Sequence, residues 1–505
     1  MKKIDLENET IASLGKKMAN GEINARGLTK HCLARIAQLD TRVNAVIELN
    51  PDALEIAAKL DDELAAGICR GPLHGLPVMV KDNLDTGDKM MTSAGSLAMD
   101  GAHATSDAFV VKRLREAGAV ILGKTNLSEW ANFRSSRSTS GWSSRGGQTR
   151  NPYALDRTPG GSSSGSAAAV ASGFSVAAIG TETDGSIVSP SAMNSIVGIK
   201  PTVGLVSRSG IIPISHSQDT AGAMARSVED AAILLGAICG PDDEDAASMN
   251  SLAHCAELKN LALKSNALNG ARIGVARNYC GFHEGVDAVI AQVITDLESC
   301  GATIVDSLEL TPTGDIRPSE NRVLSTEFKA GLNNYLAQRS PKSAVSSLSD
   351  IINFNLENAE NVMTWFQQEL LEISQETNGL GDEKYLEALK TSKSLSAEMG
   401  IDHLLKANNL DAIIAPTTCT PWLIDWVNGD NRSGGSAATA AVAGYPSVTV
   451  PAGYVHGLPV GVSFFTKAWQ EVRLLNLAYA YEQYSKRRVS PQFKDTIGYD
   501  KQNGQ

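Results

Sequence analysis

Patterns typical of helices and of strands alternate along most of this 505-residue chain. Ser106 to Ala117 has the spacing of an amphipathic helix, and the apolar run Ala119 to Leu122 follows it directly. Further apolar runs of strand length are Ser175 to Ile179, Ala271 to Ala276, Asp411 to Ala415, Ser447 to Val450 and Val460 to Phe465. Such alternation is typical of proteins in which helices cover a largely buried sheet. We therefore predict an α/β fold.

The chain has no linker rich in proline, glycine and serine that would divide it. Its length alone suggests about three domains, but without such a linker we predict a single domain over residues 1–505. Residues 319–403 are rich in helical patterns. We expect this segment to form a cap over the functional site.

The charge and hydropathy of the chain argue against some kinds of partner, although they do not exclude a local basic patch. Its 45 Lys and Arg against 56 Asp and Glu give a net charge of −11, whereas broad nucleic-acid binding needs a basic face. No apolar run reaches the roughly 18 residues of a membrane span. We therefore expect no nucleic acid and no membrane as partners.

The start of the chain bears on its location. Met1 to Lys17 lacks the apolar core of a signal peptide, which favours a cytoplasmic protein. A periplasmic or secreted protein whose signal peptide has been removed is the alternative.

The residues that most often bind metal show no ligand spacing. Seven cysteines and eight histidines are scattered along the chain without a C-x-x-C or H-E-x-x-H pattern. The cysteines are therefore expected to be free thiols in a reducing compartment. We predict no metal site.

One lysine and two serine-bearing glycine turns form the strongest chemical pattern. Lys81 ends an apolar run, and the turns Gly160-Gly161-Ser162 and Asp184-Gly185-Ser186 place their serines 24 residues apart. A serine needs a base to attack a carbonyl at neutral pH, and an uncharged lysine can be that base, directly or through a second hydroxyl. Full burial of Lys81 would lower its pKa by up to roughly 3–5 units. Backbone N–H groups of such turns can bind an oxyanion. The pattern predicts a serine hydrolase that cleaves amides.

Two other interpretations of the first turn are weaker. Gly161 to Gly165 fits G-x-S-x-G centred on Ser163, but that motif requires a strand directly before it. Arg157 to Gly160 has the composition of a turn instead. A phosphate-binding loop would need a following G-K-[ST], which is not present.

Three segments, in this order, resemble the amidase signature family. They are Val80 to Asn83, Pro159 to Ala167 and Gly180 to Ile187. The resemblance covers nearly the whole chain, with its signature core at about residues 70–225. It implies a central mixed β-sheet surrounded by α-helices, and an enzyme without a cofactor.

The resemblance also implies a Ser-cisSer-Lys triad. Ser186 would be the nucleophile that forms the acyl-enzyme. Ser162, preceded by a cis peptide bond from Gly161, would relay a proton, and Lys81 would be the terminal base. The backbone N–H groups that would line the oxyanion hole belong to Thr183, Asp184, Gly185 and Ser186.

Longer stretches are similar to the bacterial peptide amidases, which remove the C-terminal amide from peptides and release ammonia. These stretches are Gly123 to Phe133, Gly141 to Tyr153 and Lys200 to Gly222. Asp184 stands where many family members have glycine, and Val188 stands where the glutamine amidotransferase subunits have an arginine, a ready partner for a substrate carboxylate. We predict a peptide amidase that acts on a small-molecule or peptide amide, as a monomer or a homo-oligomer.

Three alternatives stand beside this prediction. The first is an amidase of other small, aryl or fatty amides, and the second is the amidotransferase subunit of a tRNA-dependent complex, against which Val188 argues. The third is a non-enzymatic relative, which has no need for all three triad groups. For substrate contacts we predict Trp130, Trp142 and Tyr445.

Overall fold

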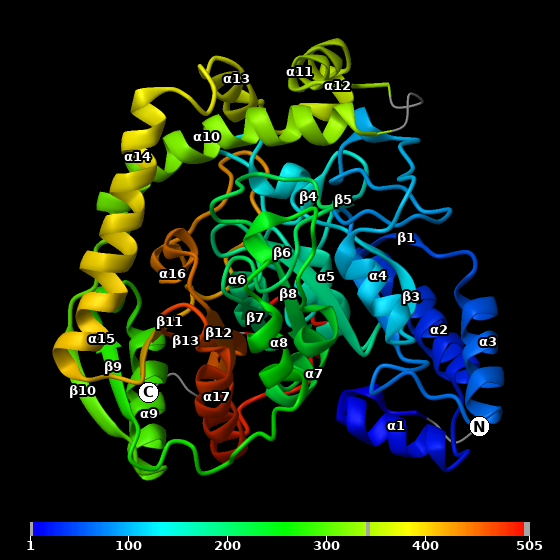
Figure 1. Cartoon of the computed structure of the whole chain (residues 1–505), viewed down its shortest axis with the longest axis horizontal. Coiled ribbons are helices and arrows are strands. Elements are labelled where there is room, and N and C mark those ends of the chain that lie inside the picture. The colour runs from blue at the N-terminus through cyan, green and yellow to red at the C-terminus, as the bar shows by residue number, and fades with distance from the viewer. Residues whose placement is uncertain (1–3, 340–343, 499–505) are drawn as a thin grey trace.

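A computed structural model describes residues 4–339 and 344–498 (Figure 1). In this part of the chain eleven strands form one sheet in the order β1-β3-β2-β6-β8-β7-β12-β13-β11-β9-β10. β2 is parallel to β3 and β6, β9 is parallel to β10 and β11, and the other neighbours are antiparallel. The predicted α/β fold with a mixed sheet is therefore confirmed. The strands are β1 (Val46–Leu49), β2 (Pro77–Lys81), β3 (Val120–Thr125), β6 (Ala177–Glu182), β7 (Val197–Lys200), β8 (Thr220–Ala225), β9 (Arg272–Ala276), β10 (Thr303–Leu308), β11 (Ala412–Pro416), β12 (Ser447–Val455) and β13 (Leu458–Phe465), with a separate hairpin of β4 (Trp142–Ser143) and β5 (Gly147–Gln148).

Helices surround this sheet, as the family resemblance predicted (Figure 1). α3 and α4 pack against β3, α7 packs against β7 and β8, and α9 and α17 pack against β12 and β13. The helices outside the segment that follows β10 are α1 (Ile11–Ala19), α2 (Ala25–Val43), α3 (Ala53–Ala65), α4 (Phe109–Glu116), α5 (Ser164–Ala171), α6 (Val188–Met193), α7 (Val228–Ile238), α8 (Leu252–Lys259), α9 (Glu284–Ser299), α16 (Ala437–Ala443) and α17 (Glu471–Ser485).

The segment predicted to form a cap is helical. Its elements are α10 (Thr313–Ala337), α11 (Leu348–Glu357), α12 (Ala359–Val362), α13 (Glu369–Gln375), α14 (Glu383–Lys393), a π-helix (Ser394–Ile401) and α15 (Asp402–Asn408). Figure 1 shows α10 crossing the top of the molecule and α14 descending along its left edge at an angle to α10, with α11 to α13 above α10. Helices α10 and α14 pack against each other, and α10 also contacts α16. None of the helices in the described ranges has the length and apolar character needed to cross a bilayer.

Several predicted strand ends are wrong, since β3 continues beyond Leu122 to Thr125 and β12 continues beyond Val450 to Val455. A third difference lies beside the site. The apolar run Ser175 to Ile179 predicted a strand that ends before Gly180, but β6 continues to Glu182. The reason is tertiary pairing, since Thr181 and Glu182 continue the antiparallel ladder opposite Ala221 and Thr220 of β8. The second serine turn therefore begins only at Thr183.

Small residues bring α5 close to the sheet. All eight residues of α5, Ser-Gly-Ser-Ala-Ala-Ala-Val-Ala, are buried, and the helix packs against β2, β3 and β6. A Cβ atom on Gly165 would lie 2.3 Å from the Ala45 carbonyl oxygen and 2.5 Å from that of Asn126. A larger residue there would push α5 away from the sheet. Because α5 follows directly on the first serine turn, this packing fixes the turn against β2 and β6.

Candidate active site

Lys81 lies at the end of β2, between β3 and β6, and its side chain is fully buried. Its Nζ atom is 2.8 Å from Ser162 Oγ, 2.9 Å from Thr181 Oγ1 and 3.3 Å from the Thr181 carbonyl oxygen. The apolar run that ends in Lys81 therefore forms a strand, which places this amine beside the first serine turn. Lys81 and Ser162, separated by 81 residues in the sequence, are in direct contact.

The electrostatics of Lys81 suit a base. Burial lowers the pKa of Lys81 to about 7, while the negative charges of Asp219 and Glu182 oppose this change. Desolvation is the larger effect because it disfavours the charged ammonium, and neither carboxylate is hydrogen-bonded to it. An amine with a pKa in this range is partly uncharged at neutral pH and can accept a proton.

The Ser162 turn has an unusual backbone. The peptide bond between Gly161 and Ser162 is cis, as the resemblance predicted, and Gly160 has a positive φ of 69°. The Ser162 carbonyl oxygen accepts a hydrogen bond from the Ser128 N–H at 3.2 Å. A Cβ atom on Gly161 would lie 2.4 Å from Ser128 Oγ, so a larger residue there would require the Ser128 side chain to move.

Ser186 lies on the adjoining turn between β6 and α6, with 8% of its surface exposed. The two turns are joined because the Ser163 N–H donates to the Ser186 carbonyl oxygen at 3.1 Å. The Glu182 carboxylate accepts from the Ile187 and Val188 N–H groups at 2.7 and 3.0 Å, which fixes the far side of the turn. In the described part of the chain, Ser186 Oγ takes part in no hydrogen bond, including one to Ser162. Its hydroxyl is therefore available to an incoming group.

The backbone of residues 183–186 has free donors. Among residues 4–339 and 344–498, no hydrogen bond uses the N–H of Thr183, Asp184, Gly185 or Ser186. Gly185 has a φ of 78°, a left-handed conformation that glycine adopts without strain. A turn of this kind, with unused N–H groups beside a serine, has the properties of the predicted oxyanion hole.

A cavity of about 550 Å³ opens next to these residues. Asn83, Thr181 and Thr183 line this cavity, together with residues 208–214 and part of α10. Asn83 Nδ2 donates to Thr181 Oγ1 at 3.0 Å, and the same oxygen contacts Lys81. Thr181 therefore both lines the cavity and contacts the Lys81 amino group.

The sequence did not indicate the contact that α10 makes with the second turn. Arg317 Nη1 donates to Asp184 Oδ2 at 2.9 Å and lies 3.1 Å from Glu320 Oε2. Arg317 and Asp184 are 133 residues apart in the sequence. An arginine within a long helix does not by itself indicate a contact with a distant turn. Only the unusual aspartate in the turn pointed to a particular role at this position.

The three residues predicted to contact substrate lie in different surroundings. Trp130 is buried in an apolar cluster with Phe133 and Phe328. Trp142 makes an edge-to-face contact with Phe366, with ring centroids 5.1 Å apart. The Tyr445 hydroxyl is 2.8 Å from Asp402 Oδ2. No hydrogen bond in the described ranges joins these side chains to the triad residues, and their role in binding stays a prediction.

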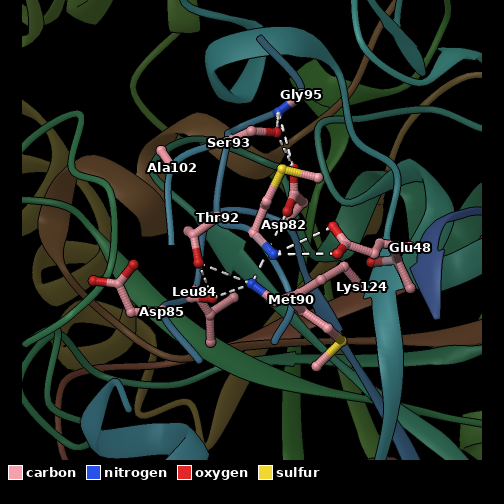
Figure 2. A network of polar contacts seen from close by, with 12 residues as sticks. Glu48, Asp82, Leu84, Asp85, Met90, Thr92, Ser93, Gly95, Ala102 and Lys124 are labelled. Atoms are coloured by element: carbon pink, nitrogen blue, oxygen red, sulfur yellow. Dashed lines mark hydrogen bonds and ion pairs between the residues drawn. The ribbon is translucent and has the colours of Figure 1, made fainter. Parts of the chain in front are cut away.

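A second buried lysine supports the strand that carries Lys81. Figure 2 shows the amino group of Lys124 directed at the Leu84 carbonyl and the Thr92 hydroxyl, at 2.7 and 3.0 Å. It also lies 3.9 Å from Asp82 Oδ1, and Asp82 accepts hydrogen bonds from Ser93 and Gly95. Burial lowers the pKa of Lys124 and raises that of Asp82, and the charge of each group partly offsets the pKa shift of the other. This network fixes the residue next to Lys81.

Lys124→Met is expected to lower the free energy of unfolding by about 2–4 kcal/mol, because it removes two buried hydrogen bonds and leaves Asp82 with less compensation. Urea denaturation measures the effect. Lys59→Met is the matched control, since Lys59 is exposed on α3 and pairs with Glu55 at the helix surface. Its effect is expected to stay within about 0.5 kcal/mol. Equal denaturation midpoints for the two variants would show that the network contributes little to stability.

In the described ranges no group of three or more His, Cys, Asp or Glu side chains is arranged to hold a metal ion. The polar groups at the site are instead an amine, two serine hydroxyls and backbone N–H groups. This donor set suits nucleophilic catalysis by a serine.

Known proteins similar to this chain are amidases and an amidotransferase subunit. The family model described as Amidase matches residues 27–475. A putative amidase of Schizosaccharomyces pombe is 37% identical over 98% of this chain and 88% of its own length. A glutamyl-tRNA(Gln) amidotransferase subunit of Pseudomonas aeruginosa is 36% identical over 95% of this chain and 98% of its own. The solved structure of native peptide amidase from Stenotrophomonas maltophilia is 49% identical, with a TM-score of 0.90 over 96% of this chain and 99% of that one.

These matches define the class of the protein as an enzyme that hydrolyses amides. The chain belongs to the amidase signature family, and the predicted family membership is confirmed.

Proposed function

We propose that the protein is a peptide amidase that removes the C-terminal carboxamide of peptides and releases ammonia. The observation that carries the proposal is the fully buried Lys81 amine in contact with Ser162, on a turn tied to that of Ser186. The 49% identity to the Stenotrophomonas maltophilia peptide amidase supports this substrate class. In this proposal residues 1–505 act as one domain, and the helical segment at residues 319–403 is its cap.

The proposed reaction begins with attack by Ser186 Oγ on the amide carbonyl carbon. Its proton passes to Ser162 Oγ, while the Ser162 proton passes to the uncharged Lys81 Nζ. The N–H groups of residues 183–186 stabilise the oxyanion, a contribution of roughly 3–4 kcal/mol for a hole of this kind.

Collapse of the tetrahedral intermediate breaks the C–N bond. Lys81 returns its proton through Ser162 to the leaving nitrogen, and ammonia departs. Water then attacks the carbonyl carbon of the Ser186 ester and passes a proton through Ser162 to Lys81. The bond between this carbon and Ser186 Oγ breaks, the proton returns through Ser162 to Ser186 Oγ, and the carboxylic acid departs.

The amidotransferase relatives favour a second candidate function, the amide-transfer subunit of a larger complex. Val188 opposes it, because the arginine that such subunits carry two residues after the nucleophile is replaced here by an apolar side chain. The two candidates differ in whether the chain acts alone and on which amide.

The purified chain alone is expected to release ammonia from an N-acylated dipeptide amide, with the free acid as the second product. Mass spectrometry of the peptide and an ammonia assay measure the two products. A chelator is expected to leave the rate unchanged, since the proposed chemistry uses no metal. Free glutamine is the comparison substrate. Ammonia release from glutamine but not from the peptide amide would favour the amidotransferase function instead.

A further inference from the structure

A charged cluster lies directly beside the nucleophile turn. Arg317 of α10 contacts Asp184 and Glu320 through a single nitrogen, Nη1, at 2.9 and 3.1 Å. Asp184 stands two residues before Ser186, so the guanidinium is anchored at the turn that carries the nucleophile. The cluster therefore joins the predicted cap to the reaction centre.

The cation is the accessible part of this cluster. The Arg317 side chain is 39% exposed, whereas those of Asp184 and Glu320 are 10% and 0% exposed. A guanidinium has five N–H donors in a rigid plane. Within the described residues, Nε and Nη2 of Arg317 take part in no hydrogen bond. These donors can bind an acceptor that enters beside Ser186.

The charge of the cluster limits which acceptor it can bind. One cation faces two carboxylates, and Gln218 Nε2 donates to Glu320 Oε1 at 3.2 Å. Burial raises the pKa of Glu320, with a further increase from the charge of Asp184, while Arg317 lowers it. The other cation that acts on Glu320, Arg432, is exposed to solvent and its effect is smaller. Because the pKa of Glu320 is about 7, this carboxyl is partly ionised at neutral pH, and Asp184 and Glu320 together carry at least as much negative charge as Arg317 carries positive charge.

A balanced guanidinium distinguishes between two kinds of ligand. A neutral peptide carbonyl oxygen can accept from its free N–H groups at little electrostatic cost. A substrate carboxylate would have to approach two acidic side chains, and like charges brought together away from water repel strongly. The arrangement thus differs from an unpaired arginine, which would favour a carboxylate.

We infer that Arg317 is a specificity-determining residue that binds a neutral carbonyl oxygen of the peptide substrate, while Asp184 and Glu320 exclude substrates with a carboxylate at that position. The inference rests on the proposed peptide amidase function. It assigns a role to the aspartate that replaces glycine in this turn. It also assigns α10 a direct part in substrate selection.

The test compares two substrates that differ in one charge, an N-acetyl aminoacyl amide and its N-succinyl counterpart. Wild-type protein is expected to prefer the neutral substrate in kcat/KM by at least about tenfold, the size of effect expected from one partly screened charge. Glu320→Gln, which keeps the shape of the side chain, is expected to reduce this ratio about tenfold. Arg317→Gln is expected to lower kcat/KM for the neutral substrate about 10- to 100-fold, since it removes a hydrogen bond from a charged donor.

Asp306→Asn is the matched control, because Asp306 pairs with Arg277 on an exposed surface away from the turn. Its substrate ratio is expected to equal that of wild-type protein. Labelling of Ser186 by a serine-reactive probe checks that each variant is folded. If wild-type, Arg317→Gln and Glu320→Gln proteins all hydrolyse the neutral amide with the same ratio of kcat/KM between the two substrates, the inference is overturned. The proposed function would then still stand. Failure of wild-type protein to hydrolyse either substrate would overturn the proposed function, and the inference with it.

Discussion

Ser186→Ala is expected to lower kcat/KM for a peptide amide by about 10⁴- to 10⁶-fold, the loss that follows removal of a serine nucleophile. The hydroxyl is the only part of the side chain that can form the acyl-enzyme, and the oxyanion N–H groups and substrate contacts account for the activity that remains. Ammonia release under single-turnover conditions measures the loss. Because the hydroxyl makes no hydrogen bond in the described part of the chain, the stability of the variant is expected to change little.

Ser189→Ala is the matched control for this variant. Ser189 lies three residues further on in α6, and its buried hydroxyl likewise has no hydrogen-bond partner in the described ranges. Its activity is expected to stay within a few-fold of wild type, as for a change that only removes a buried hydroxyl. Near-normal hydrolysis by Ser186→Ala would remove Ser186 from the nucleophile's role.

Lys81→Met is expected to lower kcat by about 10³- to 10⁵-fold, because the amine both accepts the proton of the attacking serine and returns it to the leaving nitrogen. Methionine fills similar space in a fully buried site. Initial rates measured across pH 5–9 test the role of the amine. Wild-type kcat/KM should rise with pH through about 7, the pKa that burial gives Lys81, since only the uncharged form is a base. The rise should be absent in Lys81→Met.

The stability of the same variant separates catalysis from folding. The pKa of Lys81 is lower in the folded protein than in the unfolded chain, so protonation opposes folding. This cost is complete below pH 7 and declines as the pH rises from about 7 towards the unfolded value near 10.5. Lys81→Met removes the cost, and its free energy of unfolding at pH 6 is expected to equal or exceed that of wild-type protein. A large loss of stability at pH 6 would mean that the lysine serves mainly the fold.

Much of the fold could be predicted because apolar patterns report burial. Runs such as Ala271 to Ala276 and Val460 to Phe465 became β9 and β13 with small changes at their ends. The order of the strands could not be predicted, because it depends on long-range packing. β9, for example, lies between β10 and β11, and β11 is more than 130 residues further along the chain. The extension of β6 to Glu182 depends in the same way on its partner β8.

The residues of the candidate site also differ in whether the sequence could predict them. Lys81, Ser162 and the turn at 184–186 were identified by local motifs, because tight glycine turns and a lysine after a strand are visible in short segments. The contact of Arg317 with Asp184 joins two segments that share no motif. The buried pair of Lys124, on β3, and Asp82, which directly follows β2, could not be predicted either, because it forms only when these two strands lie side by side.

The central claim is a proton path from Ser186 through Ser162 to the uncharged Lys81. The most direct test is the rate at which a fluorophosphonate probe modifies the protein between pH 5 and 9, with the modified residue identified by mass spectrometry. We expect a single adduct on Ser186, formed at a rate that rises with pH around a midpoint near 7. In Lys81→Met the rate should be far lower and independent of pH. An adduct on another residue, or the same rate and pH profile in Lys81→Met, would contradict this path.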